Sequence, residues 1–233
     1  MNDFSVKAMI LAAGLGTRLR PVTDSIPKAL VEYNGKTLLE QSLSHLKDNG
    51  ILDVIINVHH FAGKIIDYLS VNDNFGMNIA VSDESDQLLD TGGGVKKASW
   101  FFTGCQAFIV RNVDVISDLD LSDVVRYHFD HLPLTTLVVR NRMTSRNFLF
   151  DDDMILSGWE NLELGARIIT RQDMKPLHLF AFSGIQVMAP GITDLMTEVG
   201  KFSLTDMYIR LAQDHCIKGY VDNNSFWKDA GKV

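Results

Sequence analysis

The chain has little cysteine, little positive charge and no long apolar run, and each shortage excludes a class of protein. Only two cysteines occur among its 233 residues, so a disulfide-stabilised secreted scaffold is excluded and free thiols in a reducing compartment are expected. The formal net charge of −7 removes the surplus of lysine and arginine that nucleic-acid binding needs. No apolar stretch approaches the roughly 20 residues of a membrane span.

The start of the chain does not have the pattern of a secretion signal. Asp3 comes shortly before the apolar run at residues 8–13, with no basic segment ahead of it, and we therefore expect a cytoplasmic location. The composition, 46% hydrophobic and 22% charged residues, suits one sizeable core rather than two full domains. We predict a single domain over residues 1–233, with a first half at 1–133 and a second half at 134–233.

Strand-like and helix-like segments alternate in the first half. Apolar runs typical of strands lie at residues 7–12, 54–58, 79–81 and 107–110. Helices are expected at residues 37–50, at 62–69, after the glycines at 92–94, and at 121–131, the first of them opening on a capping box of Thr37 and Glu40. This alternation predicts an α/β fold whose mixed, mainly parallel sheet is flanked by helices on both faces.

At the start of the second half, strand-like segments follow one another without a helix between them. Residues 135–140 and 148–150 are typical of strands separated by polar turns, and the triple aspartate at 151–153 is interpreted as a hairpin turn. A second capping box, Ser203 and Asp206, predicts a helix that runs to about residue 214, before a strand at 217–221. An antiparallel or mixed arrangement is expected here.

The strongest chemical signal lies at residues 11–23, which read L-A-A-G-L-G-T-R-L-R-P-V-T directly after a predicted strand. Glycines let a backbone approach a phosphate closely, while Arg18 and Lys28 supply positive charge. A dinucleotide-binding fingerprint would need glycine at Leu19, and a Walker A loop ending at residues 35–37 would need glycine at Leu30. Both of these alternatives therefore fail.

Three further features have the chemistry of a binding site. The glycines at 92–94 stand at a predicted helix start, where free N–H groups can receive a base or phosphate. Close approach by backbone or by a ligand is favoured over a flexible turn as the reason for them, and we expect contact with the nucleobase. Asp114 ends an apolar strand, where open α/β sheets place ligand groups, so it is a candidate metal ligand. Asp229 is a second isolated carboxylate, beside Trp227.

Together these motifs resemble the sugar-1-phosphate nucleotidylyltransferases, whose signature is a strand leading into L-A-A-G-x-G-T-R-L-x-P-x-T and then P-K-x-L. The chain matches at residues 11–23 and 27–30, and the likeness continues through Asp114, F-S-G-I at 182–185 and W-x-D-x-G at 227–231. It implies a Rossmann-like nucleotidyltransferase fold with a nucleotide-binding first half and a sugar-phosphate-binding second half. It also implies Mg²⁺-dependent formation of a nucleotide-sugar from a nucleoside triphosphate and a sugar 1-phosphate, with release of pyrophosphate.

The resemblance further implies roles for individual residues. The catalytic residues would be Arg18, Lys28 and Asp114, and Mg²⁺ would bind Asp114 and Asp229. The residues implied to hold the nucleotide are Leu11, Ala12, Ala13, Gly14, Gly16, Thr17, Arg18, Lys28, Glu84 and Gly93. Those implied to hold the sugar phosphate are Asn112, Lys175 and Gly184. One departure from the family pattern is Val113, where a glycine usually precedes the metal-binding aspartate.

Several identities remain open within this resemblance. The chain is similar to bacterial N-acetylmuramate 1-phosphate uridylyltransferases of cell-wall recycling, and mannose-1-phosphate guanylyltransferases are the near alternative. UTP is the favoured triphosphate, with GTP or CTP as alternatives, and no nucleic acid or membrane partner is expected. The chain would act as a monomer or homodimer. A transferase for phosphocholine or another non-sugar phosphate, and a non-catalytic nucleotide-sugar sensor, are rival interpretations.

Overall fold

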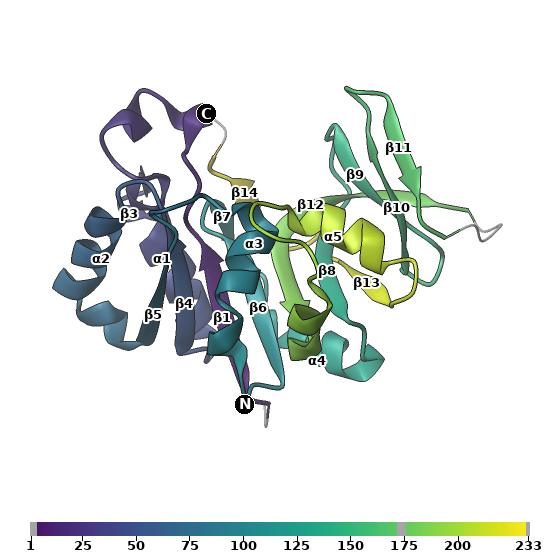
Figure 1. Cartoon of the computed structure of the whole chain (residues 1–233), viewed down its shortest axis with the longest axis horizontal. Coiled ribbons are helices and arrows are strands. Elements are labelled where there is room, and N and C mark those ends of the chain that lie inside the picture. The colour runs from purple at the N-terminus through teal and green to yellow at the C-terminus, as the bar shows by residue number, and fades with distance from the viewer. Residues whose placement is uncertain (1–3, 172–175, 232–233) are drawn as a thin grey trace.

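The fold is built on one ten-stranded mixed sheet in a computed structural model that describes residues 4–171 and 176–231 (Figure 1). The strands of this sheet are β1 (Val6–Leu11), β4 (Asp53–Val58), β5 (Asn78–Asp83), β6 (Ala107–Asn112), β8 (Thr135–Arg140), β9 (Arg146–Phe150), β10 (Leu156–Asn161), β11 (Ala166–Ile169), β12 (His178–Met188) and β13 (Ile217–Val221). Their order is β11-β10-β9-β12-β6-β1-β4-β5, while β8 pairs with both β12 and β13.

The first half is the parallel part of the sheet. Strand β1 lies between β4 and β6 and runs parallel to both, and β5 continues the parallel set beyond β4. Parallel neighbours need a crossover connection. Helices α1 (Leu38–Asp48), α2 (Ala62–Val71) and α3 (Asp90–Lys97) supply these crossovers. The predicted α/β fold is confirmed.

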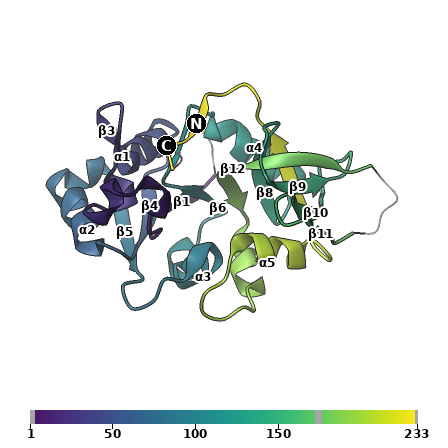
Figure 2. The ribbon, with the colours of Figure 1, turned by 90° about the horizontal axis from the view of Figure 1, so that it is seen from above.

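Helices cover both faces of the sheet, and the strand alternation explains the two cores between them. Side chains alternate along a strand, so Ala8 and Ile10 pack in one cluster with α1, α2 and α4 (Leu121–His131), while Met9 packs in a second cluster with α3 and α5 (Leu204–Leu211). Figure 2 shows α1 and α4 on one side of the sheet and α3 and α5 on the other. The expected helices on both faces are confirmed.

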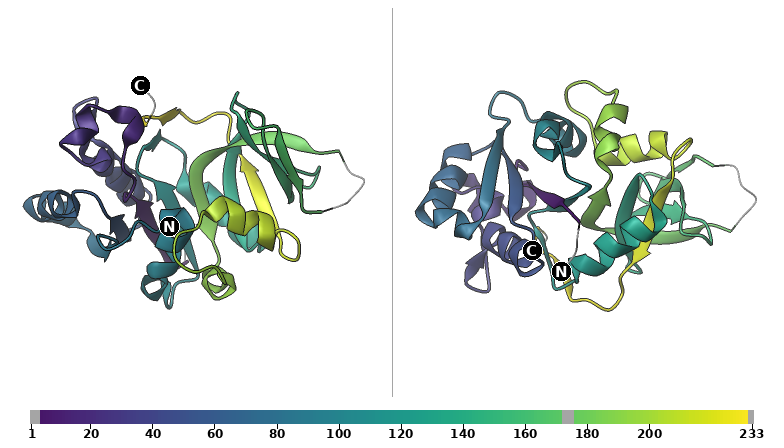
Figure 3. Two further views of the ribbon diagram at one scale, coloured as in Figure 1. Left: turned by 45° about the horizontal axis from the view of Figure 1, so that its top comes forward. Right: turned by 90° about the horizontal axis from the view of Figure 1, so that it is seen from below.

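The second half is mostly antiparallel. Strand β12 joins the two halves, since it pairs antiparallel with β6 of the first half and with β8 and β9 of the second. Strands β9, β10 and β11 form an antiparallel arm at the end of the molecule opposite α2 (Figure 3). Asp151 makes the predicted hairpin turn between β9 and β10, where its Oδ1 accepts the N–H groups of Asp153 and Ile155.

Both predicted capping boxes start helices. Thr37 Oγ1 accepts the N–H of Glu40 at α1, and Ser203 Oγ accepts the N–H of Asp206 at α5. The predicted start of the third helix is wrong, because α3 begins at Asp90 and contains the three glycines.

Shorter elements complete the chain. They are the strands β2 (Glu32–Tyr33), β3 (Lys36–Thr37), β7 (Val115–Ser117) and β14 (Trp227–Asp229), and the 3₁₀ helices η1 (Thr17–Leu19), η2 (Val22–Asp24), η3 (Lys28–Leu30), η4 (Asp73–Gly76), η5 (Ser99–Phe102) and η6 (Pro190–Leu195). Both cysteines are free thiols, as expected. Within the described ranges, no helix has the length and apolar character needed to cross a bilayer.

Candidate active site

The loop after β1 is shaped by Gly16. Its φ of +65° is left-handed, and a Cβ there would lie 2.8 Å from Thr23 Cγ2 and 3.0 Å from Lys28 Cβ, so only glycine fits without displacing those side chains. Thr23 Oγ1 donates to the Gly16 carbonyl at 2.8 Å. The loop therefore folds back on itself and brings Lys28 alongside the end of β1.

Asn57 and Glu84 support this loop from beneath. Asn57 Oδ1 accepts the N–H of Ala12 at 2.8 Å, and its Nδ2 donates to Glu84 Oε1 at 2.8 Å. Glu84 Oε2 accepts the N–H of Leu89 at 3.1 Å, and Glu84 is 0% exposed. In the structure the carboxylate of Glu84 holds Asn57 and the N–H of Leu89, and the implied contact between Glu84 and the nucleobase stays a prediction.

The glycines of α3 serve close packing. The N–H groups of Gly92 and Gly93 donate to the carbonyl of Phe202, at 2.9 and 3.3 Å. A Cβ on Gly93 would lie 2.5 Å from the Gly200 carbonyl oxygen. Close approach by another backbone segment therefore requires the glycines, and the N–H of Gly93 bonds within the protein. The implied role of Gly93 in holding the nucleotide stays a prediction.

Four predicted charged side chains meet at the carboxyl ends of β1 and β6. Lys28 and Arg18 both form ion pairs with Asp114 Oδ2, that of Arg18 Nη2 at 3.7 Å, and Arg18 Nη1 lies 3.6 Å from Asp229 Oδ2. Asp114 is 6% exposed. One guanidinium thus bridges two acids that are separated by more than a hundred residues in the sequence.

A short strand pairing brings Asp229 to this place. β14 runs antiparallel to β7, with Asp229 opposite Val115, and the N–H of Ala230 donates to the Asp114 carbonyl at 2.8 Å. A Cβ on Gly231 would lie against Asp114 Oδ2 and 3.1 Å from both Asp229 Oδ1 and Arg18 Nη2. The glycine of W-x-D-x-G is therefore required by the proximity of the two carboxylates.

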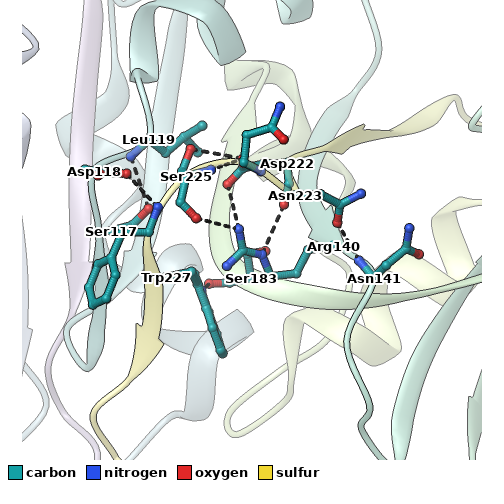
Figure 4. A network of polar contacts seen from close by, with 12 residues as sticks. Ser117, Asp118, Leu119, Arg140, Asn141, Ser183, Asp222, Asn223, Ser225 and Trp227 are labelled. Atoms are coloured by element: carbon teal, nitrogen blue, oxygen red, sulfur yellow. Dashed lines mark hydrogen bonds and ion pairs between the residues drawn. The ribbon is translucent and has the colours of Figure 1, made fainter.

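A buried polar network anchors the segment that leads into β14 (Figure 4). Arg140 donates to the Asp222 carbonyl at 3.0 Å, to Asp222 Oδ2 at 3.2 Å and to the Ser225 carbonyl at 2.9 Å. Trp227 Nε1 donates to the Ser183 carbonyl at 2.8 Å. These bonds hold the β14 segment against β8 and β12, and so hold Asp229 near Asp114.

Two adjoining cavities form one cleft around these charges. The first, of about 410 Å³, is lined by the loop after β1 with Lys28, Asp114 and Lys201. The second, of about 600 Å³, extends over β9, β10, β12 and α5. Five residues line both cavities: Leu11, Arg18, Asp90, Thr91 and Asn112. The charged cluster therefore lies where two ligands in one cleft would meet.

The second cavity is lined by polar side chains that the sequence did not single out. Gln186 Oε1 and Tyr208 Oη are buried and have no hydrogen-bond partner within residues 4–171 and 176–231.

Arg142 also lines this cavity. It donates to the Phe182 carbonyl at 3.1 Å and lies over the Trp227 ring, 4.7 Å from its centroid. Burial lowers the pKa of Arg142, while the Asp229 carboxylate opposes that shift. The sequence could have indicated Arg142 in the same way as Asp114, because each residue comes shortly after the carboxyl end of an apolar strand.

Two of the three residues implied to hold the sugar phosphate lie side by side in the structure, and their role stays a prediction. Gly184 has a φ of +80°, and a Cβ there would lie 3.1 Å from Asn112 Nδ2. Asn112 itself lines both cavities. Lys175 lies outside the described residues.

Asp114 and Asp229 are the residues that could hold a divalent cation. Mg²⁺ is usually bound by one or two carboxylates, with waters and substrate phosphates completing its oxygen shell. In the described part of the chain, no cluster of three or more histidine, cysteine, aspartate or glutamate side chains could hold a metal ion. The carboxylates of Asp114 and Asp229 point to the same place, where the two cavities meet. This arrangement suits a divalent ion that also binds a phosphate of the ligand.

Comparison with known proteins agrees with this arrangement. The profile of the nucleotidyl transferase family matches residues 7–148, which include the glycine loop, Arg18, Lys28 and Asp114. The chain belongs to the nucleotidyl transferase family. The resemblance expected from the sequence motifs is confirmed.

The chain has relatives with several named activities. It is 32% identical to an N-acetylmuramate alpha-1-phosphate uridylyltransferase of Caulobacter vibrioides, over 96% of this chain and 91% of the relative. It is 31% identical to a UTP--glucose-1-phosphate uridylyltransferase of Synechocystis, over 98% of this chain and 61% of the relative, so it spans about three fifths of that longer protein. It is also 35% identical to a mannose-1-phosphate guanyltransferase of Gibberella zeae, over 58% of this chain and 37% of the relative.

Solved structures show the same fold at low identity. A putative glucose-1-phosphate thymidylyltransferase from Bacillus anthracis, in complex with a sucrose, superposes with a TM-score of 0.80 at 17% identity, covering 98% of this chain and 91% of that one. HddC from Yersinia pseudotuberculosis, complexed with GMP-PN, superposes with a TM-score of 0.72 at 22% identity, covering 97% and 94%. The Rossmann-like nucleotidyltransferase fold predicted from the sequence is confirmed.

Proposed function

We propose that this transferase condenses a nucleoside triphosphate with a sugar 1-phosphate to give a nucleotide-sugar and pyrophosphate. The observation that carries the proposal is the bridge from Arg18 to Asp114 and Asp229, with Lys28 on the same carboxylate. This cluster lies where the glycine-loop cavity meets the second cavity. The triphosphate would occupy the first cavity and the sugar phosphate the second, with the reacting phosphates between them.

The chemistry is an in-line displacement. An oxygen of the sugar phosphate attacks the α-phosphorus, and the bond from that phosphorus to the bridging oxygen of pyrophosphate breaks. The protein need supply no nucleophile, since such transfers depend on positioning and on neutralising the phosphate oxygens. Arg18 and Lys28 would turn from the carboxylates to those oxygens. Mg²⁺, held by Asp114 and Asp229, would supply further charge neutralisation.

For the substrates, we infer N-acetylmuramate 1-phosphate and UTP. The relative from Caulobacter, named for that activity, aligns over nearly the whole length of both chains. A second relative of the same name, from Neisseria meningitidis, is 42% identical over half of this chain.

The experiment is pyrophosphate release with Mg²⁺ and each of UTP, GTP, CTP and dTTP, paired with N-acetylmuramate, glucose or mannose 1-phosphate. We expect the highest kcat/KM for UTP with N-acetylmuramate 1-phosphate. Arg18→Ala should lose most of the turnover, whereas Arg126→Ala, at an exposed arginine on α4 that pairs with Asp123 of the same helix, is the matched control. Nucleotide binding without pyrophosphate from any pair would indicate a sensor instead.

A second candidate is mannose-1-phosphate guanylyltransferase activity. The observation in its favour is the relative from Gibberella zeae, which matches 58% of this chain at 35% identity. Preference for GTP and mannose 1-phosphate in the same assay would select it.

A further inference from the structure

Two cations that line the second cavity, Arg142 and Arg146, form no ion pair within residues 4–171 and 176–231. The charged side chains that line it are Arg18, Asp90, Arg142, Arg146, Asp206 and Asp229. Arg18 is paired with Asp229, and Asp206 Oδ2 accepts the hydroxyl of Ser203 at 2.8 Å. The guanidinium of Arg146 forms no ion pair or hydrogen bond within residues 4–171 and 176–231, and Arg146 is exposed.

Arg146 also differs from Arg142 in its position. Arg142 is fixed on the Phe182 carbonyl, and the charge of Asp229 acts on it, so it belongs to the side of the cavity where phosphates would react. Arg146 is the first residue of β9, where it pairs with Asn161 of β10 in the arm. Arg18, Lys28 and Arg142 already provide positive charge for the phosphates.

The other polar groups of the cavity are neutral. Gln186 and Tyr208 each present a buried oxygen without a partner in the described ranges, and Asn147 and Asn161 also line the wall. Such groups suit the hydroxyl and amide groups of a sugar. They do not account for an unpaired guanidinium, whose planar fork matches a carboxylate in two parallel hydrogen bonds.

We propose that Arg146 binds a carboxylate of the sugar or of its substituent, so that the preferred sugar 1-phosphates are acidic sugars. The inference rests on the proposed function, because it assigns the second cavity to the sugar. It goes beyond that function in naming the residue that recognises the acidic group and in extending the preference to other acidic sugar 1-phosphates.

The test compares sugars that differ by one acidic group. N-acetylmuramate 1-phosphate is matched with N-acetylglucosamine 1-phosphate, and glucuronate 1-phosphate with glucose 1-phosphate. Pyrophosphate release gives kcat/KM for each, and calorimetry gives the affinity of each sugar phosphate. For the wild-type protein we expect the acidic member to be preferred about tenfold or more in both pairs, as a charged hydrogen bond would provide.

Two arginine variants on the arm separate this role from a general effect of charge. Arg146→Gln should remove most of the acid-to-neutral preference in both measurements. Arg167→Gln changes a neighbouring arginine on β11 whose guanidinium lies 3.8 Å from Glu160 Oε2, and should leave the preference as it is.

The outcomes separate the two proposals. Equal use of both members of each pair, or an unchanged preference in Arg146→Gln, would overturn the role of Arg146 while the transferase activity stands. Binding of the acidic sugar phosphates that depends on Arg146, without pyrophosphate from any pair, would uphold the acidic subsite and refute the proposed reaction.

Discussion

Asp114 lies in a nearly closed position, with Lys28 and Arg18 against its carboxylate. Replacing it with asparagine preserves its size and removes one of the two negative charges available to a divalent ion. We expect Asp114→Asn to lower turnover about 100-fold or more, as the loss of metal-borne charge stabilisation predicts. Steady-state pyrophosphate release measures this. Turnover close to wild type would contradict the role assigned to Asp114.

His128 makes stability depend on pH. It is 3% exposed, its Nδ1 lies 3.0 Å from Thr136 Oγ1, and burial lowers its pKa from 6.5 to about 4. Between these values the unfolded chain binds a proton that the folded chain does not, so stability is present above pH 6.5 and is lost as pH falls toward 4. At pH 5 this loss is on the order of 2 kcal/mol.

Urea unfolding at pH 7 and pH 5 measures this dependence, with His128→Gln as the comparison. Glutamine can still bond Thr136 but does not titrate, so the variant should lose less stability between the two pH values. Parallel pH profiles for both proteins would show that His128 is not responsible. His45, whose pKa burial and Arg111 also lower to about 4, remains in both proteins.

Helices α3 and α2 each contain a glycine, and the two positions differ in whether a larger side chain would fit. A Cβ on Gly93 would lie 2.5 Å from the Gly200 carbonyl oxygen, whereas nothing lies within 4 Å of a Cβ on Gly63 in α2. Gly93→Ala should therefore destabilise by about 1 to 3 kcal/mol through overpacking. Gly63→Ala should stabilise by roughly 0.5 to 1 kcal/mol. Urea midpoints measure both, and equal shifts would contradict the packing role of Gly93.

The segment before β14 depends on the buried pair of Arg140 and Asp222. Asp222→Asn would leave the Arg140 guanidinium without its counter-charge, and breaking such a pair costs about 3 to 5 kcal/mol. The exposed pair of Asp123 and Arg126 on α4 is the control, since Asp123→Asn should change stability by less than about 1 kcal/mol. Thermal melts compare the two. Similar Tm values for both variants would show that the network does not anchor this segment.

The sequence predicted elements well where the signal was local. Thr37 and Ser203 cap their helices as expected, because the bonds that fix a helix start lie within four residues. The start of α3 failed for the opposite reason. Phe202, more than a hundred residues away, accepts the N–H groups of Gly92 and Gly93 and stabilises a helix that local propensity disfavours.

At the scale of the whole molecule, β12 makes the two halves one sheet. It pairs with β6 on one side and with β8 and β9 on the other. We therefore expect the predicted single domain to unfold in one transition. Trp100 reports on the first half and Trp159 on the second, so single-tryptophan variants and circular dichroism should give the same urea midpoint. Separate midpoints would mean two domains.

The candidate site was predictable only in part. Family motifs singled out Arg18, Lys28, Asp114 and Asp229, and the structure brings these four together. The second cavity was not foreseen, because its wall is assembled from β9, β10, β12 and α5, whose pairing no short motif records. The support that Glu84 gives to Asn57 was not foreseen either, because a strand-end carboxylate that supports a loop has the same sequence pattern as one that contacts a ligand.

The shared guanidinium has a consequence for the order in which ligands arrive. While Arg18 spans both acids and Lys28 lies on one of them, a divalent ion approaching alone is repelled by two cations already in place. A polyphosphate attracts those same cations away and exposes the acids behind them. We therefore expect the ion and the nucleotide to be taken up as a pair, each raising the affinity of the site for the other.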